Sequence, residues 1–395
     1  MQENILLEFH TTIASFPGDI LDRLGSIGPL SEIRRRRFDT SLKALTHTSP
    51  FLEAGRMISA KAGLKKFIQH EKGIFSVDAV YKNLDRKIAA RLKSLLGKGL
   101  NAVYAYEDGA LESFKKAHQL KIKCLYDLPI GYWRSARKIL DVEKEKWPEW
   151  SSTLIGLGDS SEKLHRKDEE LRLADMNFVA SQFTADTLKD FPGQLNEIQV
   201  IPYGFPPVYN QRTYKSAFNK PLKLLFVGGL SQRKGIAELF SVANELKEHI
   251  ELTIIGKKTT NACKALDNAL SQHRWIPTLS HEKILEMMRE NDVLVFPSLF
   301  EGFGLVITEA MSQGTPVITT ERTAGPDLIN HGENGWLVEA GSEQKLKEAI
   351  EVILLKPFIV REAGYAAMKT AQQRPWHVYG SELAITIKDR IATKI

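Results

Sequence analysis

The stretch from Asp292 to Pro326, DVLVFPSLFEGFGLVITEAMSQGTPVITTERTAGP, decides the predicted fold. Its short apolar run, Val293 to Phe296, is typical of a strand buried inside a parallel sheet. A loop at residues 301–304 (EGFG) comes next, and a predicted helix from Leu305 to Gln313 leads to a second strand at Val317 to Thr319. This order predicts an α/β domain whose ligand site lies at the carboxyl edge of a parallel sheet.

The loop between this strand and helix has the residues of a binding site. Gly302 and Gly304 permit positive φ angles or the close approach of a ligand. The free amides at the start of the helix, at Leu305, favour an anion. Two carboxylates, Glu301 and Glu309, flank the loop with seven residues between them. That spacing alone is shared by many pairs of solvated charges, whereas the whole combination is more specific.

This combination resembles a known signature. The segment EGFGLVITEAM at residues 301–311, with GTPVI at residues 314–318, is similar to the signature of the retaining glycosyltransferases of family four, also called glycosyl transferases group 1. These enzymes have the GT-B fold, in which two Rossmann-like, doubly wound α/β domains face a cleft. The resemblance implies that Glu301 lies near the transferred sugar and that Glu309 binds the donor ribose. A carboxylate is an acceptor-only group suited to paired hydroxyls.

Bulk composition agrees with a two-domain globular protein. The chain has 395 residues, a formal net charge of +6 and 43% hydrophobic residues. Cys124 and Cys263 are far apart, so no disulfide framework is predicted and a reducing cytoplasm is the simplest location. No apolar run approaches the roughly 18 residues that a spanning helix needs, and the first ten residues do not resemble a signal peptide.

Basic residues are concentrated near the amino terminus. The first hundred residues hold 17 Lys and Arg against 10 Asp and Glu, with the densest cluster at Arg34 to Arg37 and further lysines at Lys61, Lys65 and Lys66. This excess has two readings, a solvated surface or an attraction to anionic lipid headgroups or an anionic acceptor. The second reading would place the protein peripherally on the inner face of the cytoplasmic membrane. Nucleic acid is not predicted, because no interleaved aromatic and basic motif accompanies the run.

The first half of the chain alternates predicted strands and helices. The predicted strands are Ile5–Phe9, Asn101–Tyr106, Lys123–Tyr126, Ala174–Ala180 and Ile198–Ile201. The main predicted helices are Ile20–Arg37, Leu64–Leu96 with a break at Gly73 to Ser76, Ala110–Gln119 and an exposed one at Ser161–Leu173. Residues 202–207 are dense in proline and glycine and form the predicted linker. We therefore predict an acceptor-side domain at 1–205 and a nucleotide-sugar domain at 206–374. By resemblance, a terminal helix at 375–395 crosses back to the first domain.

Acidic residues follow two neighbouring strands of the first half. Glu107 and Asp108 come after one strand, and Asp127 comes after the next, which predicts an acceptor-side cleft. Many members of the resembled family have a histidine, in contact with the donor sugar, at the position of Asp127, so this sequence departs from the pattern there. Asp127 is a candidate for binding a sugar hydroxyl or acting as a base. The alternative is that it caps the turn before Pro129.

The second half begins with a candidate diphosphate site. The apolar run Leu222 to Val227 is followed by Gly228 and Gly229, and Arg233 and Lys234 stand at the entry of a helix. Glycines allow close approach, arginine offers forked donors and lysine a point charge. The segment is neither the dinucleotide fingerprint nor a phosphate-binding Walker loop. It does resemble the Arg-Lys-Gly motif of the same family, which implies that both cations neutralise the donor diphosphate.

Combining these observations gives the predicted site. The resemblance also places backbone near Ile276 against the nucleotide base. The predicted donor-binding residues are Gly229, Arg233, Lys234, Ile276, Glu301, Gly302, Phe303, Gly304, Leu305 and Glu309, and the predicted catalytic residues are Glu301, Arg233, Lys234 and Asp127. The donor is expected to be a UDP-, GDP- or ADP-sugar. No metal or other cofactor is expected, because no Asp-x-Asp motif occurs.

The predicted function is therefore a metal-independent, retaining hexosyltransferase. It would move a sugar from a nucleoside diphosphate sugar to an acceptor hydroxyl in the synthesis of cell-envelope or exopolysaccharide glycans or glycoconjugates. The acceptor would be a glycan, a lipid-linked compound or a small molecule. Three alternatives stay open: a GT-B phosphorylase, which needs inorganic phosphate, a sugar-nucleotide epimerase, which needs no acceptor, and a non-catalytic nucleotide-sugar binder.

Overall fold

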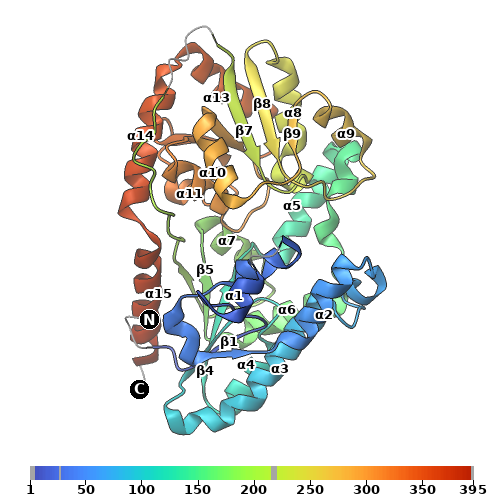
Figure 1. Cartoon of the computed structure of the whole chain (residues 1–395), viewed down its shortest axis with the longest axis vertical. Helices are drawn as coiled ribbons and strands as arrows, with labels where there is room; N and C mark the ends of the chain where they lie inside the picture. Colours follow the sequence, from blue (N-terminus) through green and yellow to red (C-terminus); the bar gives the residue numbers. More distant parts are fainter. Residues whose placement is uncertain (1–4, 26–27, 215–219, 393–395) are drawn as a thin grey trace.

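The computed structural model describes residues 5–25, 28–214 and 220–392. The chain forms two lobes along its long axis, each built around parallel strands (Figure 1). Outside the described residues lie the start of the predicted first domain (1–4), residues 215–219 of the predicted second domain, the end of the predicted terminal helix (393–395) and residues 26–27 of the predicted helix Ile20–Arg37.

The second lobe contains one sheet of six parallel strands. They are β7 (Leu222–Val227), β8 (Ile250–Ile255), β9 (Arg274–Ile276), β10 (Val293–Phe296), β11 (Val317–Thr320) and β12 (Gly335–Val338). Their spatial order is β12-β11-β10-β7-β8-β9, so the winding reverses between β7 and β10. In open α/β sheets such a reversal leaves a crevice beyond the carboxyl ends of the two central strands, where ligands bind. The predicted doubly wound domain is thus confirmed for this lobe.

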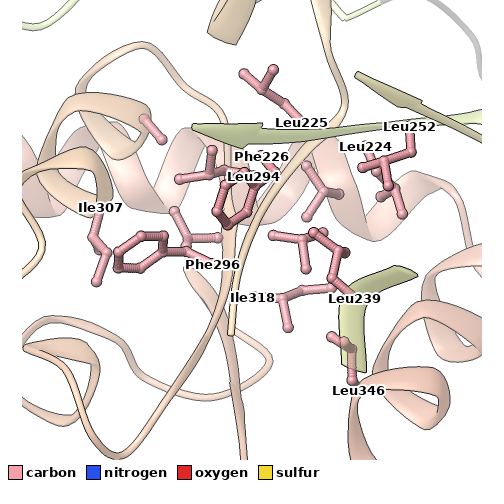
Figure 2. Packing of buried hydrophobic residues seen from close by; sticks show 14 of the residues in the cluster. Leu224, Leu225, Phe226, Leu239, Leu252, Leu294, Phe296, Ile307, Ile318 and Leu346 are labelled. Atoms are coloured by element: carbon pink, nitrogen blue, oxygen red, sulfur yellow. The ribbon is translucent and has the colours of Figure 1, made fainter. Parts of the chain in front are cut away.

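Helices cover both faces of this sheet. They are α8 (Ile236–Glu245), α9 (Lys264–Leu270), α10 (His281–Glu290), α11 (Leu305–Ser312), α12 (Gly325–Leu328), α13 (Glu343–Leu355) and α14 (Phe358–Gln373). Leu224 and Phe226 of β7, with Leu294 and Phe296 of β10, are buried among helix side chains such as Leu239 (Figure 2). Because both faces are covered, the central strands are continuous apolar runs, and these were the easiest strands to predict.

The first lobe contains a four-stranded parallel sheet in the order β3-β4-β5-β6. Its strands are β3 (Ala102–Tyr106), β4 (Lys123–Leu128), β5 (Met176–Val179) and β6 (Glu197–Val200). Four α-helices of this lobe follow residue 100: α4 (Leu111–Gln119), α5 (Trp133–Lys146), α6 (Ser161–Leu173) and α7 (Gln182–Thr187). They are preceded by α2 (Pro50–Lys61) and α3 (Val77–Leu95), which run along one side of the lobe (Figure 1).

The amino-terminal region differs from the prediction. The first strand is not Ile5–Phe9 but β1 (Phe9–Thr11), which pairs with β2 (Thr46–Thr48) in a separate two-stranded sheet. Ile5 stays 42% exposed, so the apolar run before Phe9 does not mark burial. The predicted helix Ile20–Arg37 is instead α1 (Ile20–Leu24), ended by the cap residue Gly25, and a 3-10 helix over Gly28–Arg36. The predicted helical region Leu64–Leu96 has its predicted break, since α3 begins at Val77 after the cap residue Ser76, but the part before the break forms only a short 3-10 helix at Lys65–Ile68.

The predicted exposure of the helix Ser161–Leu173 is wrong, although its bounds are confirmed as those of α6. Six of its residues are buried: Leu164, Arg166, Lys167, Asp168, Glu170 and Leu171. Asp168 accepts hydrogen bonds from the Tyr132 hydroxyl at 2.6 Å and from Trp133 Nε1 at 2.8 Å. Buried charges of this kind are tolerated because each has partners, and a charge-rich sequence does not reveal those partners.

The last helix, α15 (Trp376–Ala392), packs on the first lobe. Its residue Ile387 lies in one cluster with Leu125, Phe178 and Ile201 of the first lobe. The chain therefore crosses back between lobes as the resemblance implied. The predicted domain boundary at 205/206 falls between the two sheets and stays a prediction. Within the described residues, no helix is long and apolar enough to cross a membrane.

Candidate active site between the lobes

The carboxyl ends of β7 and β10 hold the candidate site. Beyond β7, a 3-10 turn over Gln232–Lys234 carries the two predicted cations, with Ser231 Oγ accepting from the Arg233 amide at 3.4 Å. The next residue, Gly235, has a φ of +68°, and a Cβ there would lie 2.0 Å from the Pro297 carbonyl oxygen. Only glycine therefore lets this turn pack against the end of β10. The Leu299 amide donates to the Arg233 carbonyl at 2.9 Å and holds the two segments together.

Arg233 and Lys234 meet Glu301 at this edge. The Arg233 guanidinium lies 3.1 Å from Glu301 Oε2 and donates to the Phe300 carbonyl at 2.6 Å, and the Lys234 ammonium forms a close ion pair with the same carboxylate. Burial lowers the pKa of Arg233 and of Lys234, and the carboxylate between them opposes that shift by favouring the charged forms. Two cations share one anion, so the group has a surplus positive charge suited to an anionic ligand.

The loop after Glu301 leads into the amino terminus of α11. Gly304 has a φ of +88° and is the cap residue of α11, with no side-chain hydrogen bond to the helix amides. The side chain of Leu305, the first helical residue, is 45% exposed. Phe303 is buried against Tyr203, with ring centroids 4.9 Å apart, and its carbonyl accepts from the Ala324 amide at 2.9 Å. The Tyr203 ring and the Ala324 amide thus hold the loop in place. The amides at the start of α11 have no side-chain cap and are available to an anion.

Glu309 lies one turn further along α11. Its side chain is 24% exposed, and its carboxylate is 3.7 Å from His281 Nδ1. Burial raises the pKa of Glu309, while the neighbouring imidazole, when protonated, lowers it. A partly buried carboxylate that keeps some exposure is available to accept hydrogen bonds from hydroxyls.

Gly302 brings the lobes into contact. Its carbonyl accepts hydrogen bonds from Ser181 Oγ at 2.5 Å and Thr184 Oγ1 at 2.9 Å, which are the N-cap residue and a first-turn residue of α7 in the first lobe. A Cβ at this position would lie 2.0 Å from the Pro129 carbonyl oxygen, and one at Gly131 would lie 2.5 Å from the Phe300 ring. The sequence predicts the close approach of a ligand at Gly302. In the structure, the backbone of Pro129 and Ile130 in the first lobe approaches Gly302 closely.

A cavity of about 410 Å³ opens beside these contacts. The second lobe lines it with Gly229, Ser231, Arg233, Lys234, Thr259 and Phe300, and the first lobe adds a larger set that includes Glu107, Trp133, Arg137, Asp159 and Lys167. The cavity thus adjoins the Arg233–Lys234–Glu301 group and reaches into both lobes.

The structure brings together some of the predicted site residues and leaves others apart. Gly229, Arg233 and Lys234 line the cavity, and Glu301 contacts the two cations. Ile276 ends β9 at the same sheet edge, where its carbonyl accepts from the Gly256 amide at 3.0 Å. Ile276 and Glu309 are not among the cavity-lining residues. Their predicted roles in donor binding stay predictions.

Sequence reasoning missed Lys167 and Asp159 and gave Glu107 little weight. Lys167 was missed because α6 was taken as a solvated helix. The recurrence of Leu164, Lys167 and Leu171 at helical spacing was a signal for a buried face that includes the lysine. No signal in the sequence indicates that Leu164 and Lys167 of this helix line the cavity between the lobes.

Asp127 lies inside β4, which continues to Leu128 instead of ending at Tyr126 as predicted. Its side chain is 97% buried and accepts a hydrogen bond from the Tyr104 hydroxyl. Burial raises the pKa of Asp127 to about 6. The residue is not among those lining the cavity, and its catalytic role stays a prediction.

Replacing Asp127 with asparagine is expected to raise the free energy of unfolding more at pH 8 than at pH 4. The folded pKa of about 6 exceeds the ordinary value of 3.8, so the folded state binds more protons between these values and loses stability as pH rises through them. The gain is at most about 3 kcal/mol, from a shift of roughly two units. Urea unfolding at both pH values measures it, with the exposed Asp141→Asn as control. Equal effects of Asp127→Asn at pH 4 and pH 8 contradict the assignment.

Comparison with known proteins gives the class. Residues 210–370 match the family model "Glycosyl transferases group 1". A D-inositol 3-phosphate glycosyltransferase of Pseudarthrobacter chlorophenolicus is 27% identical over 56% of this chain and 58% of its own length. The amylovoran biosynthesis glycosyltransferase AmsK of Erwinia amylovora is 30% identical over 40% of this chain and 42% of its own length. The matched part of the chain thus spans about three fifths or less of these relatives.

Solved structures agree on the fold. Sucrose-phosphate synthase from Thermosynechococcus elongatus has a TM-score of 0.63 at 19% identity, with 83% of both chains covered. Anabaena HepE in complex with UDP has a TM-score of 0.61 at 16% identity, covering 97% of this chain and all of that one. Over residues 210–370 the chain is similar to the group 1 glycosyltransferases, and the solved structures show that it has the two-domain GT-B fold.

Proposed function

We propose that this protein transfers a sugar from a nucleoside diphosphate sugar to an acceptor hydroxyl with retention of anomeric configuration. The observation that carries the proposal is the convergence of Arg233, Lys234 and Glu301 at the switch point of the second sheet, beside a cavity between the lobes. The UDP complex of Anabaena HepE supports a nucleotide donor, and the names of the curated relatives support a hydroxyl-bearing acceptor. Glycan or glycoconjugate synthesis is the setting that these relatives suggest.

The residues present fit the chemistry of donor cleavage. The bond between the anomeric carbon and the diphosphate breaks, the diphosphate takes its electron pair, and the acceptor oxygen bonds to the same carbon as it loses its proton. Arg233, Lys234 and the helix amides at Leu305 oppose the charge that develops on the leaving group. Glu301 and Glu309 would bind hydroxyls of the sugar and of the ribose. We propose that these side chains act without a metal or other cofactor.

A nucleotide panel tests donor binding. UDP, GDP and ADP, with UDP-glucose, GDP-mannose and ADP-glucose, are added to the parent and to Glu309→Ala, and the melting temperature is measured. One nucleotide class should stabilise the parent, because a ligand that binds only the folded state raises its stability. The shift should shrink in Glu309→Ala and persist in Glu286→Ala, whose carboxylate is exposed on α10. No shift in the parent with any nucleotide contradicts the proposed function.

We also propose peripheral contact with anionic lipid through the side of the first lobe that carries α2 and the segment after it. Exposed apolar side chains gather here, with Phe51 77% and Ile58 67% exposed, and Lys61, Lys65 and Lys66 are exposed between or beside them. The arginine run is less available than its sequence suggested, since Arg34, Arg36 and Arg37 have acidic partners in Asp22 and Glu53. A reducing compartment, as expected for two buried free thiols, fits contact from the cytoplasmic side.

Replacing Lys61, Lys65 and Lys66 by alanine is expected to reduce flotation with phosphatidylserine liposomes. Each lysine near an anionic surface contributes about 1 kcal/mol, so a loss of roughly a hundredfold in partitioning is expected. Alanine at Lys345, Lys347 and Lys356 of the second lobe removes equal charge and should leave flotation unchanged. Absence of flotation by the parent, or equal loss in both variants, contradicts lipid contact through this surface.

A further inference from the structure

The first-lobe wall of the cavity carries a fixed row of charged groups. Lys167 Nζ on α6 lies 3.3 Å from Asp159 Oδ2 and 3.5 Å from Glu107 Oε1, and all three residues line the cavity. Glu107 follows β3 directly, and Asp159 precedes α6. The side chains of Glu107 and Lys167 are 10% and 11% exposed, so what remains accessible faces the cavity.

Hydrogen bonds to α6 hold this row in place. Glu170, one turn beyond Lys167, accepts from the backbone amides of Asp108, Ala110 and Leu111 at 2.8, 3.1 and 3.2 Å. Arg166 bonds the Asp108 carboxylate at 2.8 Å. The loop that carries Glu107 is therefore tied to the helix that carries Lys167, and the separation of the two side chains is set by the fold. Such preorganisation is what a binding site requires.

Apart from Arg137, the rest of this wall is mostly apolar. Ile130, Leu140, Leu154 and Leu164 line the cavity around the charged row. A pocket with apolar walls and a few fixed polar groups is the usual form of a small-molecule site. Lys167 itself offers little free charge to an anion, because it is paired with Glu107 and Asp159 and a third carboxylate, Asp108, lies 3.8 Å from its ammonium.

We propose that Glu107 and Lys167 bind two neighbouring hydroxyls on a neutral sugar or cyclitol ring of the acceptor. The carboxylate accepts from one hydroxyl and the ammonium donates to the next, while the apolar side chains cover the faces of the ring. The inference rests on the proposed function, because the same cavity is bordered by Arg233 and Lys234, which would hold the donor diphosphate. Burial raises the pKa of Glu107 to about 7, so near neutrality its carboxyl group can both donate and accept.

Saturation-transfer NMR tests the inference. Glucose, galactose, mannose and myo-inositol are examined one at a time with the full-length protein, each with and without UDP. At least one ring should receive saturation from the parent, and its signal should fall at least fivefold in Glu107→Gln and in Lys167→Met. The control Glu112→Gln, an exposed carboxylate on α4, should behave as the parent.

A third variant tests whether the ring signal is lost because the cavity is blocked and not because the protein unfolds. Ile155 is 63% exposed and lines the cavity, so Ile155→Trp should block it without disturbing the core. This variant is also expected to lose the ring signal while its melting temperature stays within a few degrees of the parent. The inference is overturned if no neutral ring binds the parent, or if Ile155→Trp and Lys167→Met bind as the parent does.

The nucleotide panel distinguishes a wrong acceptor assignment from a wrong proposed function. Glu107→Gln should keep the parent's stabilisation by nucleotide, because its side chain lies on the first-lobe wall. A nucleotide shift without ring binding overturns the acceptor assignment alone. Absence of any nucleotide shift in the parent overturns the proposed function, whatever the rings do.

Discussion

Lys234→Ala is expected to lower kcat for cleavage of the sugar–diphosphate bond by a factor of about 10²–10³, the usual effect of removing one preorganised group that opposes developing charge. The Lys234 side chain is 11% exposed and contacts Glu301. Its charge therefore acts in a site with little water, where it stabilises the leaving group more than a solvated charge would. Release of nucleoside diphosphate from the donor found in the binding panel measures the effect.

The matched control is Lys223→Ala. Lys223 is an exposed lysine of β7, near the amino end of the same strand whose carboxyl end leads to Lys234. It should keep the parent's kcat. A Lys234→Ala protein that is folded and turns over at the parent's rate would show that the leaving group is stabilised elsewhere.

Gly302→Ala is expected to lower kcat by about a hundredfold, a typical cost of misplacing reacting groups by about 1 Å. The added methyl would lie 2.0 Å from the Pro129 carbonyl, and both atoms belong to backbone, so the contact is relieved only by separating the lobes. Separation breaks the hydrogen bonds from Ser181 and Thr184 to the Gly302 carbonyl. Nucleotide stabilisation should persist, since the predicted donor contacts Arg233, Lys234 and Glu309 are not part of the clash with Pro129.

Gly156→Ala provides the control for this change. Gly156 lines the same cavity, but an added Cβ there has no heavy atom within 4 Å. It should retain most of the parent's kcat. Small-angle scattering of Gly302→Ala should show a larger radius of gyration than the parent. An unchanged radius together with unchanged turnover would contradict the role of this contact in closing the cleft.

The second lobe was predicted well because its signals are local. The runs Leu222–Val227 and Val293–Phe296 are strands with the predicted bounds, since strands covered on both faces need unbroken apolar residues. The helix α13 (Glu343–Leu355) also begins at a local signal, the cap residue Ser342, whose side chain accepts from the Lys345 amide. The contact of Arg233 with Glu301 links segments 68 residues apart, and the family resemblance placed both in one site before any distance was known.

The first lobe was predicted less well because its signals are not local. The short strands Phe9–Thr11 and Thr46–Thr48 are stabilised by pairing with each other, and neither has an apolar run that marks it. On α6, Lys167 and Glu170 suggested a solvated face, yet their partners come from residues 107–111 and 159. No spacing within the helix shows such partners. The cavity depends on how the lobes meet, which the sequence of either lobe does not encode by itself.

The central claim is tested most directly by proton NMR of the first sugar released from UDP-glucose, GDP-mannose or ADP-glucose in the absence of acceptor. A retaining transfer to water gives the same anomer as the donor before mutarotation mixes the two forms. We predict that one donor is consumed, that the α-anomer appears first, and that Lys234→Ala abolishes the signal. Release of the β-anomer first, or no consumption of any donor that stabilises the protein, would contradict the account.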